Sequence, residues 1–336
     1  MGVKAQTVQA AQTAHMAADM NHFLLDLYRL SYERPLGEFQ DAALRLVQQV
    51  LPFDSAAWGT AIEAGDGVTT HNIHLHRQPE EILSAYEQIR HLDTAAQAAS
   101  RRPRSTLGIH ARRWFASAEQ AAVRDYGRRF QLANYFIASN LDTRANCFNW
   151  VTLYRHDEEQ HCLEHECALL DTVSPHLMQA LAINRLAHLE RVNAEPRDNT
   201  GRAIADLRGV LHHADAAFCD LLRREWPAWR SGRLPDALME HVRQGPSRWV
   251  GRNTVVSQRE EHGLWFLDAR ERCPADNLTP RERLVVELVA RGLSHKDIAQ
   301  QLKRSPLTIR NQVRAVYEKL DVRNAASLIK ALRAGN

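Results

Sequence analysis

Long hydrophobic runs are absent from this sequence. No segment approaches the roughly 18 to 20 consecutive apolar residues that a membrane-spanning helix needs, and residues 1–20 lack the apolar core of a signal peptide. Cysteine is scarce: five in 336 residues, an odd number without a C-x-x-C pair, argue against a disulfide framework and favour a reducing compartment. We therefore expect a cytoplasmic protein without membrane contact.

Proline, glycine and aromatic residues are also few. The 12 prolines and 15 glycines exclude long collagen-like or low-complexity stretches, and the aromatic fraction is 7%. The hydrophobic and charged fractions, 44% and 25%, are typical of a globular protein. Because one hydrophobic core seldom serves more than about 200 residues, the length predicts two or three domains.

Positive charge is concentrated at the C-terminal end. Residues 278–336 contain 12 Lys and Arg against 5 Asp and Glu, a net charge of +7, whereas the whole chain carries +3. Residues 1–277 therefore carry −4. A basic end on a mildly acidic body is typical of a nucleic-acid-binding domain.

Strand and helix patterns are interspersed in the first half of the chain. Alternating or β-branched stretches predict strands at residues 55–62, 68–76, 134–140 and 147–155. Apolar residues three and four apart predict helices near 39–51, at 79–92 and from Leu163 past Leu181. Residues 93–113 show neither pattern and are expected to be irregular. Together these segments predict an N-terminal arm over 1–19 and an α+β domain over 20–192.

A second small domain is predicted over residues 202–272. The polar segment 193–201 contains Pro and Gly and is expected to be a linker. The patterns beyond it predict a strand, a turn and a strand over 203–215, a helix over 216–224, and two more strands over 249–257 and 263–269.

Three capped helices are predicted from Leu278 onward. Each begins after a hydroxyl side chain that can accept a hydrogen bond from the first helical turn: Thr279, Ser294 and Ser305. Gly292 stands where the first helix should end, and the third helix runs to about Leu320. With a tight turn between the last two helices, the pattern predicts a helix-turn-helix.

The third of these helices has two distinct faces. Its apolar residues at steps of three and four are Ile309, Val313, Val316 and Leu320. The opposite face carries Leu307, Arg310, Asn311 and Arg314. We expect the first face to pack and the second to be able to enter the major groove of DNA.

These segments resemble the DNA-binding domain of LuxR/GerE-type transcriptional regulators. The resemblance is carried by residues 278–283, 290–299, 305–311 and 319–320, within a stretch from 278 to 332. It implies an all-α four-helix domain, which we place at 276–336, with the third helix for recognition and the fourth, at 324–332, for dimerisation on DNA. His295 and Gln312 differ from the Asn and His that are common in the family.

The resemblance implies DNA contacts for seven residues. They are Lys296, Ser305, Leu307, Thr308, Arg310, Asn311 and Arg314. Arg310, Asn311 and Arg314 are expected to reach bases or phosphates, whereas Lys296 and Thr308 suit helix capping or phosphate contact. A solvated helix face is the alternative explanation, which the local charge of +7 disfavours.

The two preceding domains resemble sensor domains. Residues 20–192 are similar to a GAF-like fold and residues 202–272 to a small PAS-like fold, each an antiparallel sheet with helices. Neither contains the acidic pocket of a phosphorylated receiver domain or a Walker motif. Tyr86, Asp93 and Trp114 are partly similar to the acyl-homoserine-lactone pocket of quorum sensors, but the proline that follows Asp in that pocket is missing, and this ligand class is not predicted.

Aromatic residues on the predicted strands offer a ligand pocket. Phe148, Trp150, Thr152 and Tyr154 alternate onto one strand face. The candidate ligand-binding residues are Trp58, Tyr135, Phe136, Trp150 and Tyr154. Packing of a sheet core is the commoner reason for such a stripe, and it is favoured over a pocket by roughly two to one.

A metal or redox site, or an enzyme built on it, is the alternative function. His161, Cys162, His165 and Cys167 are close in sequence, and imidazole and thiolate suit zinc. No second pair of ligands at a recognisable spacing exists, and Cys167 fits the apolar stripe of the long helix, so a structural role is favoured. No Ser/His/Asp or paired-carboxylate arrangement indicates catalysis, and neither a cofactor nor a bound metal is expected.

The sequence as a whole predicts a dimeric, ligand-controlled transcriptional regulator that is not an enzyme. Its expected partners are double-stranded promoter DNA, a small-molecule effector, a second copy of the chain and RNA polymerase. Dimerisation is expected through the long helix around Leu170–Leu189 and through the fourth C-terminal helix.

Overall fold

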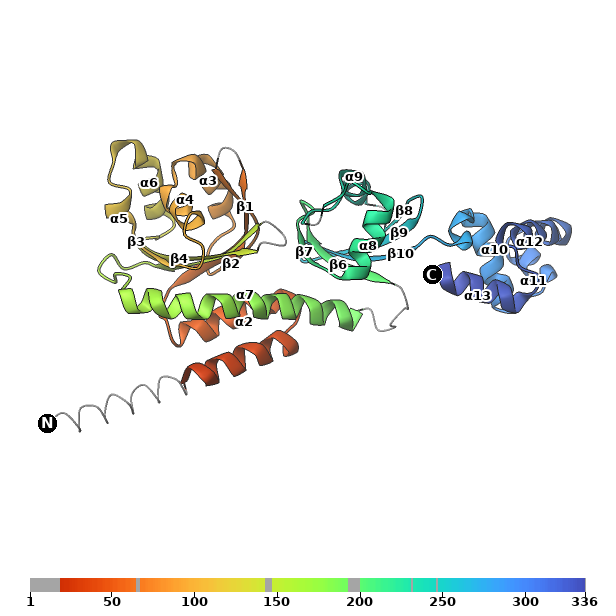
Figure 1. The fold of residues 1–336 in the computed structure, drawn as a ribbon, viewed down its shortest axis with the longest axis horizontal. Helices are drawn as coiled ribbons and strands as arrows, with labels where there is room; N and C mark the ends of the chain where they lie inside the picture. The colour runs from red at the N-terminus through yellow and green to blue at the C-terminus, as the bar shows by residue number, and fades with distance from the viewer. Residues whose placement is uncertain are drawn as a thin grey trace.

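The structure is a computed structural model that describes residues 19–64, 67–142, 147–192, 200–230, 232–245 and 247–335. The chain forms two domains built on antiparallel sheets and then a helical C-terminal domain (Figure 1). This arrangement confirms the predicted fold class. Most of the predicted arm and of the predicted linker lies outside the described residues. None of the described helices is long and apolar enough to cross a membrane.

The first domain contains a five-stranded antiparallel sheet with the order β2-β1-β5-β4-β3. Its strands are β1 (Ser55–Ala64), β2 (Gly67–His76), β3 (Leu107–His110), β4 (Asn134–Asp142) and β5 (Cys147–Arg155). β5 is therefore the central strand, and β2 and β3 form the two edges.

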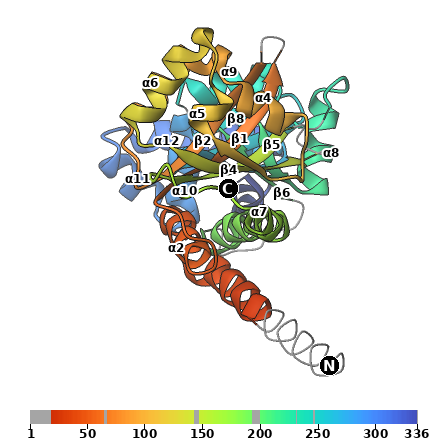
Figure 2. The same cartoon turned by 90° about the vertical axis from the view of Figure 1, so that its left-hand side faces the viewer.

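Helices cover both faces of this sheet. One face packs on α2 (Leu36–Gln48) and α7 (Glu164–Val192), as Figure 1 and Figure 2 show. A helix over residues 19–33 packs on α7 from the side away from the sheet. The other face lies under short helices: α3 (Glu81–Ile89), η1 (Arg90–Leu92), α4 (Thr94–Ser100), α5 (Ala111–Trp114), η2 (Ala118–Gln120) and α6 (Ala121–Arg129). Because successive residues of a strand point to opposite faces, each strand contributes side chains to both layers.

Residues 93–113 are more regular than their pattern predicts. They contain α4, the edge strand β3 and most of α5, so the prediction of an irregular segment was wrong. Asp93 caps α4 by accepting hydrogen bonds from the N–H groups of Ala95 and Ala96, at 3.0 and 3.1 Å. β3 is only four residues long and is held by pairing with β4, a contact that its own sequence does not reveal.

The second domain is built on another five-stranded antiparallel sheet, with the order β7-β6-β10-β9-β8. Its strands are β6 (Gly201–Asp206), β7 (Leu211–Ala214), β8 (Arg248–Val250), β9 (Thr254–Glu261) and β10 (Leu264–Glu271). α8 (Ala216–Glu225) and α9 (Asp236–Arg243) pack on one face through Phe218, Leu222 and Leu238. The sequence patterns did not predict α9.

The other face of the second sheet joins the first domain. Ile204, Leu264 and Phe266 form a buried cluster with Leu36 and Leu189 of the first domain. These strand residues alternate with others that face α8 and α9, so the second sheet is buried on both sides.

A polar contact borders this joint. His188 Nε2 of α7 and Glu261 Oε2 of β9 lie 2.6 Å apart. Gly37 in the first turn of α2 faces His262 in the turn between β9 and β10, and a Cβ on that glycine would lie 2.6 Å from the imidazole ring. Glycine therefore lets this turn approach α2 closely.

The C-terminal domain consists of four helices that follow the short 3-10 helix η3 (Pro274–Asn277). They are α10 (Pro280–Ala290), α11 (His295–Gln301), α12 (Pro306–Leu320) and α13 (Ala325–Gly335). The buried residues of α12 are Ile309, Val313, Val316 and Leu320, as predicted. They belong to two clusters, which join α12 to α10 and α11 and to α10 and α13.

Candidate DNA interface and ligand cavity

Hydrogen-bonded caps set the start of the three helices of the helix-turn-helix. Thr279 Oγ1 accepts a hydrogen bond from the N–H of Glu282, and Glu282 Oε2 accepts one from the N–H of Thr279. Ser294 forms the same reciprocal pair with the residue three positions on, at α11. Ser305 Oγ accepts a hydrogen bond from the N–H of Thr308 at α12. These contacts confirm the predicted helix starts.

α12 turns one face to the domain and the other to solvent. The buried face packs against α10 and α11, so the side chains opposite to it point outward. Six of the seven predicted DNA-binding residues lie on or next to this helix, and all six are exposed: Ser305, Leu307, Thr308, Arg310, Asn311 and Arg314. The seventh, Lys296, is exposed in the first turn of α11.

Cationic side chains surround the exposed face of α12. Arg310 and Asn311 have no ion-pair or hydrogen-bond partner among the residues that the structure describes. Arg314 Nε lies 3.0 Å from Glu318 Oε1, an exposed pair of the kind that contributes little to stability. Arg323, just beyond α12, lines a groove together with Arg310 and Arg314. Arg323 lies outside α12, so the two-faced pattern of that helix does not indicate it.

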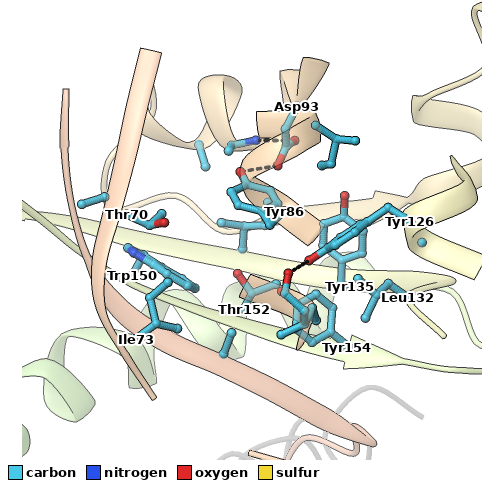
Figure 3. A pocket seen from close by; sticks show the side chains of 18 of the residues that line it. Thr70, Ile73, Tyr86, Asp93, Tyr126, Leu132, Tyr135, Trp150, Thr152 and Tyr154 are labelled. Carbon is cyan, nitrogen blue, oxygen red and sulfur yellow. Dashed lines mark hydrogen bonds between the residues drawn. The ribbon is translucent and has the colours of Figure 1, made fainter. Parts of the chain in front are cut away.

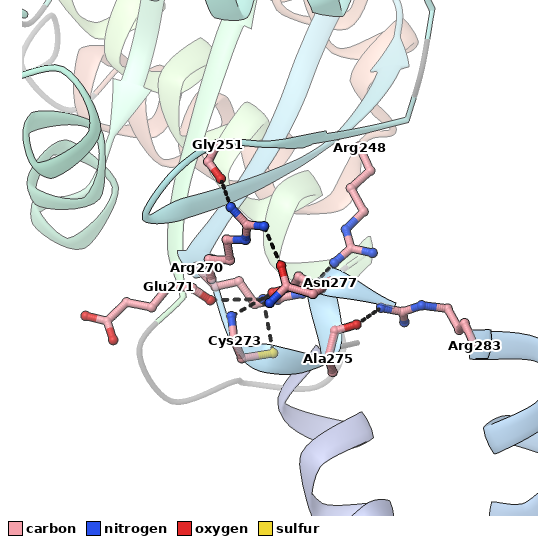
Figure 4. A network of polar contacts seen from close by, with 10 residues as sticks. Arg248, Gly251, Arg270, Glu271, Cys273, Ala275, Asn277 and Arg283 are labelled. Carbon is pink, nitrogen blue, oxygen red and sulfur yellow. Dashed lines mark hydrogen bonds and ion pairs between the residues drawn. The ribbon is translucent and has the colours of Figure 1, made fainter. Parts of the chain in front are cut away.

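A carboxylate in η3 pairs with two arginines of the second domain, Arg248 and Arg270, which are labelled in Figure 4. The side chain of Asp276 in η3 is shielded from solvent, and its carboxylate accepts hydrogen bonds from Arg270 at 2.6 and 2.8 Å and from the N–H of Cys273 at 2.7 Å. Arg248 also pairs with it. Burial opposes its charge, but the hydrogen bonds from Arg270 and Cys273 outweigh burial and lower the pKa of Asp276 to about 2.

The helix η3 also packs into the C-terminal domain. Ala275 is buried in the cluster that contains Leu328 and Leu332 of α13. Arg283 of α10 donates a hydrogen bond to the carbonyl oxygen of Ala275 at 3.2 Å (Figure 4). η3 therefore links the sheet of the second domain to α10 and α13 of the C-terminal domain.

The first domain contains a cavity between the outer face of its sheet and the helices α3, α4 and α6 (Figure 3). Its volume is ≈ 130 Å³, well above the space that a single water molecule needs. Apolar and aromatic side chains form most of its wall, and no Lys, Arg or His lies among the lining residues in the described part of the domain. Such a cavity suits a small molecule with little or no negative charge.

Three of the five predicted ligand-binding residues line this cavity: Tyr135, Trp150 and Tyr154. Phe148 and Thr152 line it as well, because every second residue of β5 faces the same side of the sheet. The sequence pattern therefore identified the cavity-facing side of the central strand.

Trp58 and Phe136 do not line the cavity, so their assignment was wrong. Trp58 is buried beside Phe39 of α2, with ring centroids 6.3 Å apart, and Phe136 lies 4.8 Å from the guanidinium carbon of Arg155. Both belong to the core between the sheet and the helices α2 and α7. Adjacent strand residues point to opposite faces, so Tyr135 faces the cavity and Phe136 cannot.

A tyrosine and an aspartate supply the main polar contact of the cavity. The hydroxyl of Tyr86 donates a hydrogen bond to Asp93 Oδ2 at 2.9 Å, while Asp93 Oδ1 accepts the cap hydrogen bonds of α4. Burial raises the pKa of Asp93, and it also raises the pKa of Tyr86, Tyr126 and Tyr154, so the phenols remain neutral. Trp150 Nε1 is buried and has no acceptor among the described residues.

The sequence pattern indicated some of the polar residues of this cavity and not others. Tyr86 and Asp93, which are partly similar to a lactone pocket, do line the cavity. Trp114 does not, since its indole N–H donates a hydrogen bond to Thr94 Oγ1 at 3.0 Å near the surface. Tyr126 was not singled out, because on α6 it lies far in sequence from the strands that it faces.

The four residues of the alternative metal or redox site lie beside β3. His161 and His165 are exposed. Cys162 and Cys167 pack against Gly108, where a Cβ would lie 2.8 and 3.1 Å from their side chains. Burial raises the pKa of both thiols, that of Cys162 to about 12, which disfavours the thiolate that metal binding requires. Within the described ranges, no three His, Cys, Asp or Glu side chains are placed to hold a metal ion.

Two solved structures share similarity with much of the chain, at low identity. The crystal structure of Escherichia coli SdiA is 13% identical, covers 94% of this chain and 97% of its own, and gives a TM-score of 0.38. The crystal structure of CepR2 from Burkholderia cenocepacia, described as an N-acylhomoserine lactone dependent LuxR family transcription factor, is 16% identical, covers 50% of this chain and 96% of its own, and gives a TM-score of 0.39.

Known relatives match the C-terminal domain much more closely. A putative HTH-type transcriptional regulator of Mycobacterium tuberculosis, Rv0890c, is 46% identical over 61 residues, which are 18% of this chain and 7% of that protein. The transcriptional regulatory protein DesR of Bacillus subtilis is 46% identical over 55 residues, 16% of this chain and 28% of its own. This chain thus spans only a small part of the length of these relatives. The family of bacterial regulatory proteins called the luxR family matches residues 276–332, and the C-terminal domain is therefore a helix-turn-helix domain of the luxR family.

Proposed function

We propose that this chain is a sequence-specific transcriptional regulator that binds double-stranded promoter DNA through α12. The observation that carries the proposal is the outward face of that helix, where Arg310 and Asn311 have no partner among the described residues. A guanidinium group can pair with guanine and a side-chain amide with adenine in the major groove, which is wide enough for a helix. Positive charge from Arg314 and Arg323 beside them suits the phosphate backbone.

Selection of binding sites by the full chain tests this function. Duplexes with a random centre are incubated with the protein in an excess of competitor DNA, and the bound fraction is sequenced. We expect one sequence to be enriched, with two half-sites about one helical turn apart if the protein binds as a dimer. Recovery of the random pool without enrichment would contradict sequence-specific binding.

Dimer formation belongs to the same proposal. The apolar residues of α7, among them Leu170, Leu177, Leu181 and Leu189, are buried within the chain itself. These side chains are therefore unavailable to a second copy, and a dimer contact through α7 would use the other faces of this helix, so dimerisation through α7 stays a prediction. We also propose α13 as a contact between two copies of the chain. RNA polymerase is the proposed protein partner at the promoter.

Lys296 is expected to act on phosphate. It is exposed in the first turn of α11, at the end of a helix where backbone N–H groups also favour anions. Lys296→Ala should weaken binding to all sequences by a similar factor and reduce the slope of log K against log salt by about one per subunit. Fluorescence anisotropy at several salt concentrations measures both. Arg281→Ala, which removes one positive charge from the exposed surface of α10, should leave the slope nearly unchanged. Relaxed preference at one base position in Lys296→Ala would contradict the phosphate role.

We further propose that the cavity of the first domain holds a small effector without negative charge. Among the residues that the structure describes, its lining includes a carboxyl group, Asp93, and no Lys, Arg or His, so a bound carboxylate would be buried there without a counter-ion. The free N–H of Trp150 favours a ligand with a hydrogen-bond acceptor, and the surrounding rings favour apolar or aromatic groups. This chemistry supports a neutral or cationic compound.

Matched pairs of compounds test the charge requirement. We expect indole to raise the melting temperature of the full chain and indole-3-carboxylate at the same concentration to leave it unchanged, because a ligand that binds the native state stabilises it by about 2.7 kcal/mol at 100 times its Kd. Differential scanning fluorimetry measures the shift. Ala99→Leu, which fills part of the cavity, should abolish it. Stabilisation by the carboxylate alone would contradict the proposal.

A further inference from the structure

Leu307 is a large apolar side chain that the C-terminal domain leaves in water. It is 67% exposed, the highest value among the exposed large hydrophobic residues in the part of the chain that the structure describes. It belongs to neither hydrophobic cluster of its domain. It precedes Ile309 by two residues, which at 3.6 residues per turn places it about 200° around the helix from that buried side chain. Packing of the domain therefore does not account for Leu307.

Its position is fixed at the tip of the recognition helix. Leu307 is the second residue of α12, between Pro306 and Thr308. The side chain of Ser305 caps this turn and its hydroxyl lies 2.8 Å from the hydroxyl of Thr308. Arg310, three residues further on, shares the face of Leu307, so a groove that receives one must receive the other.

The major groove offers only one apolar group that an exposed leucine side chain can contact. The isobutyl group of leucine neither donates nor accepts hydrogen bonds. The base pairs present donors, acceptors and a single apolar group, the C5-methyl of thymine. We propose that Leu307 contacts the C5-methyl group of one thymine in each half-site, next to the bases that Arg310 and Asn311 contact. This assignment rests on the DNA-binding function proposed above.

The surroundings of Leu307 favour DNA over a protein partner as its contact. Lys303 and Arg304 are exposed in the turn that precedes α12, and Arg310 follows one turn later. An apolar side chain flanked on both sides by cations fits a surface that combines phosphates with thymine methyl groups.

Replacing thymine by deoxyuridine tests the contact directly, because the exchange removes only the methyl group. The selected operator is synthesised with one thymine exchanged at a time, and the affinity of the full chain is measured by fluorescence anisotropy. One exchange in each half-site should weaken wild-type binding about fourfold, the equivalent of ~0.8 kcal/mol for one buried carbon group. For Leu307→Ala the same exchange should have no effect.

A second exposed leucine provides the matched control. Leu284 lies on α10 of the same domain and is 45% exposed, and Leu284→Ala should keep the sensitivity of the wild type to deoxyuridine. Melting curves of both variants establish that they fold. If Leu307→Ala binds with the full wild-type sensitivity, or if no exchange weakens the wild type, the methyl contact is refuted while DNA binding stands. Failure to select any operator refutes the DNA-binding function itself.

Discussion

Arg310→Ala is expected to lose about 1–3 kcal/mol of discrimination at one base position in each half-site, roughly a 5- to 150-fold change in relative affinity. Arg310 lies in the second turn of α12 and is exposed, without a partner among the described residues. Its guanidinium group can form two parallel hydrogen bonds to the O6 and N7 atoms of guanine, and alanine can form neither.

Site selection with the variant measures this loss as a relaxed preference at a single position. Arg281→Ala is the matched control, since Arg281 is exposed on α10 of the same domain and not on the face of α12. It should lower affinity slightly through charge and keep the wild-type sequence preference. An Arg310→Ala protein that selects the wild-type operator would show that Arg310 contacts phosphate and not a base.

Asp276→Asn is expected to destabilise the chain by about 2–4 kcal/mol, because it removes one partner of a buried ion-pair network. The side chain of Asp276 is shielded from solvent, and the variant leaves Arg270 and Arg248 without their carboxylate. Urea denaturation monitored by tryptophan fluorescence measures the change. Asp220→Asn, which breaks an exposed pair with Arg223 on α8, should cost less than about 1 kcal/mol.

The same network predicts a dependence of stability on pH. The pKa of Asp276 is about 2 in the folded chain, below its ordinary value of 3.8. A group whose pKa is lowered by folding stabilises the native state above its unfolded pKa, and this contribution disappears as the pH falls from about 4 towards 2. The stability difference between wild type and Asp276→Asn should therefore shrink over that interval. A constant difference between pH 5 and pH 2 would contradict this.

The sequence determined the DNA-binding unit almost completely. Its helix starts depend on hydrogen bonds between residues three positions apart, as at Thr279 and Glu282, and its buried face depends on apolar steps of three and four along α12. Both are local interactions, so the pattern contains all the information they require. The exposure of Arg310 and Asn311 follows directly, because they lie opposite the apolar face.

Whether an aromatic face lines a cavity or fills a core was decided by the tertiary structure alone. Alternation along β5 places Trp150 and Tyr154 on one side, but only the distance at which α3, α4 and α6 cover that side leaves space there. Side chains also alternate along β1 and β4, where Trp58 and Phe136 face the helices α2 and α7 on the other side of the sheet. Their aromatic character is identical, so composition could not separate the two groups.

The contacts between domains likewise required the folded chain. Asp276 meets Arg248, which is 28 residues away, and Leu189 of α7 packs against Ile204, Leu264 and Phe266 of the second sheet. A stripe of leucines predicts only that this helix face is buried. It does not predict which surface covers the face, because the hydrophobic effect is non-directional. The sequence thus determined which faces are buried, and only the tertiary structure determined what they are buried against.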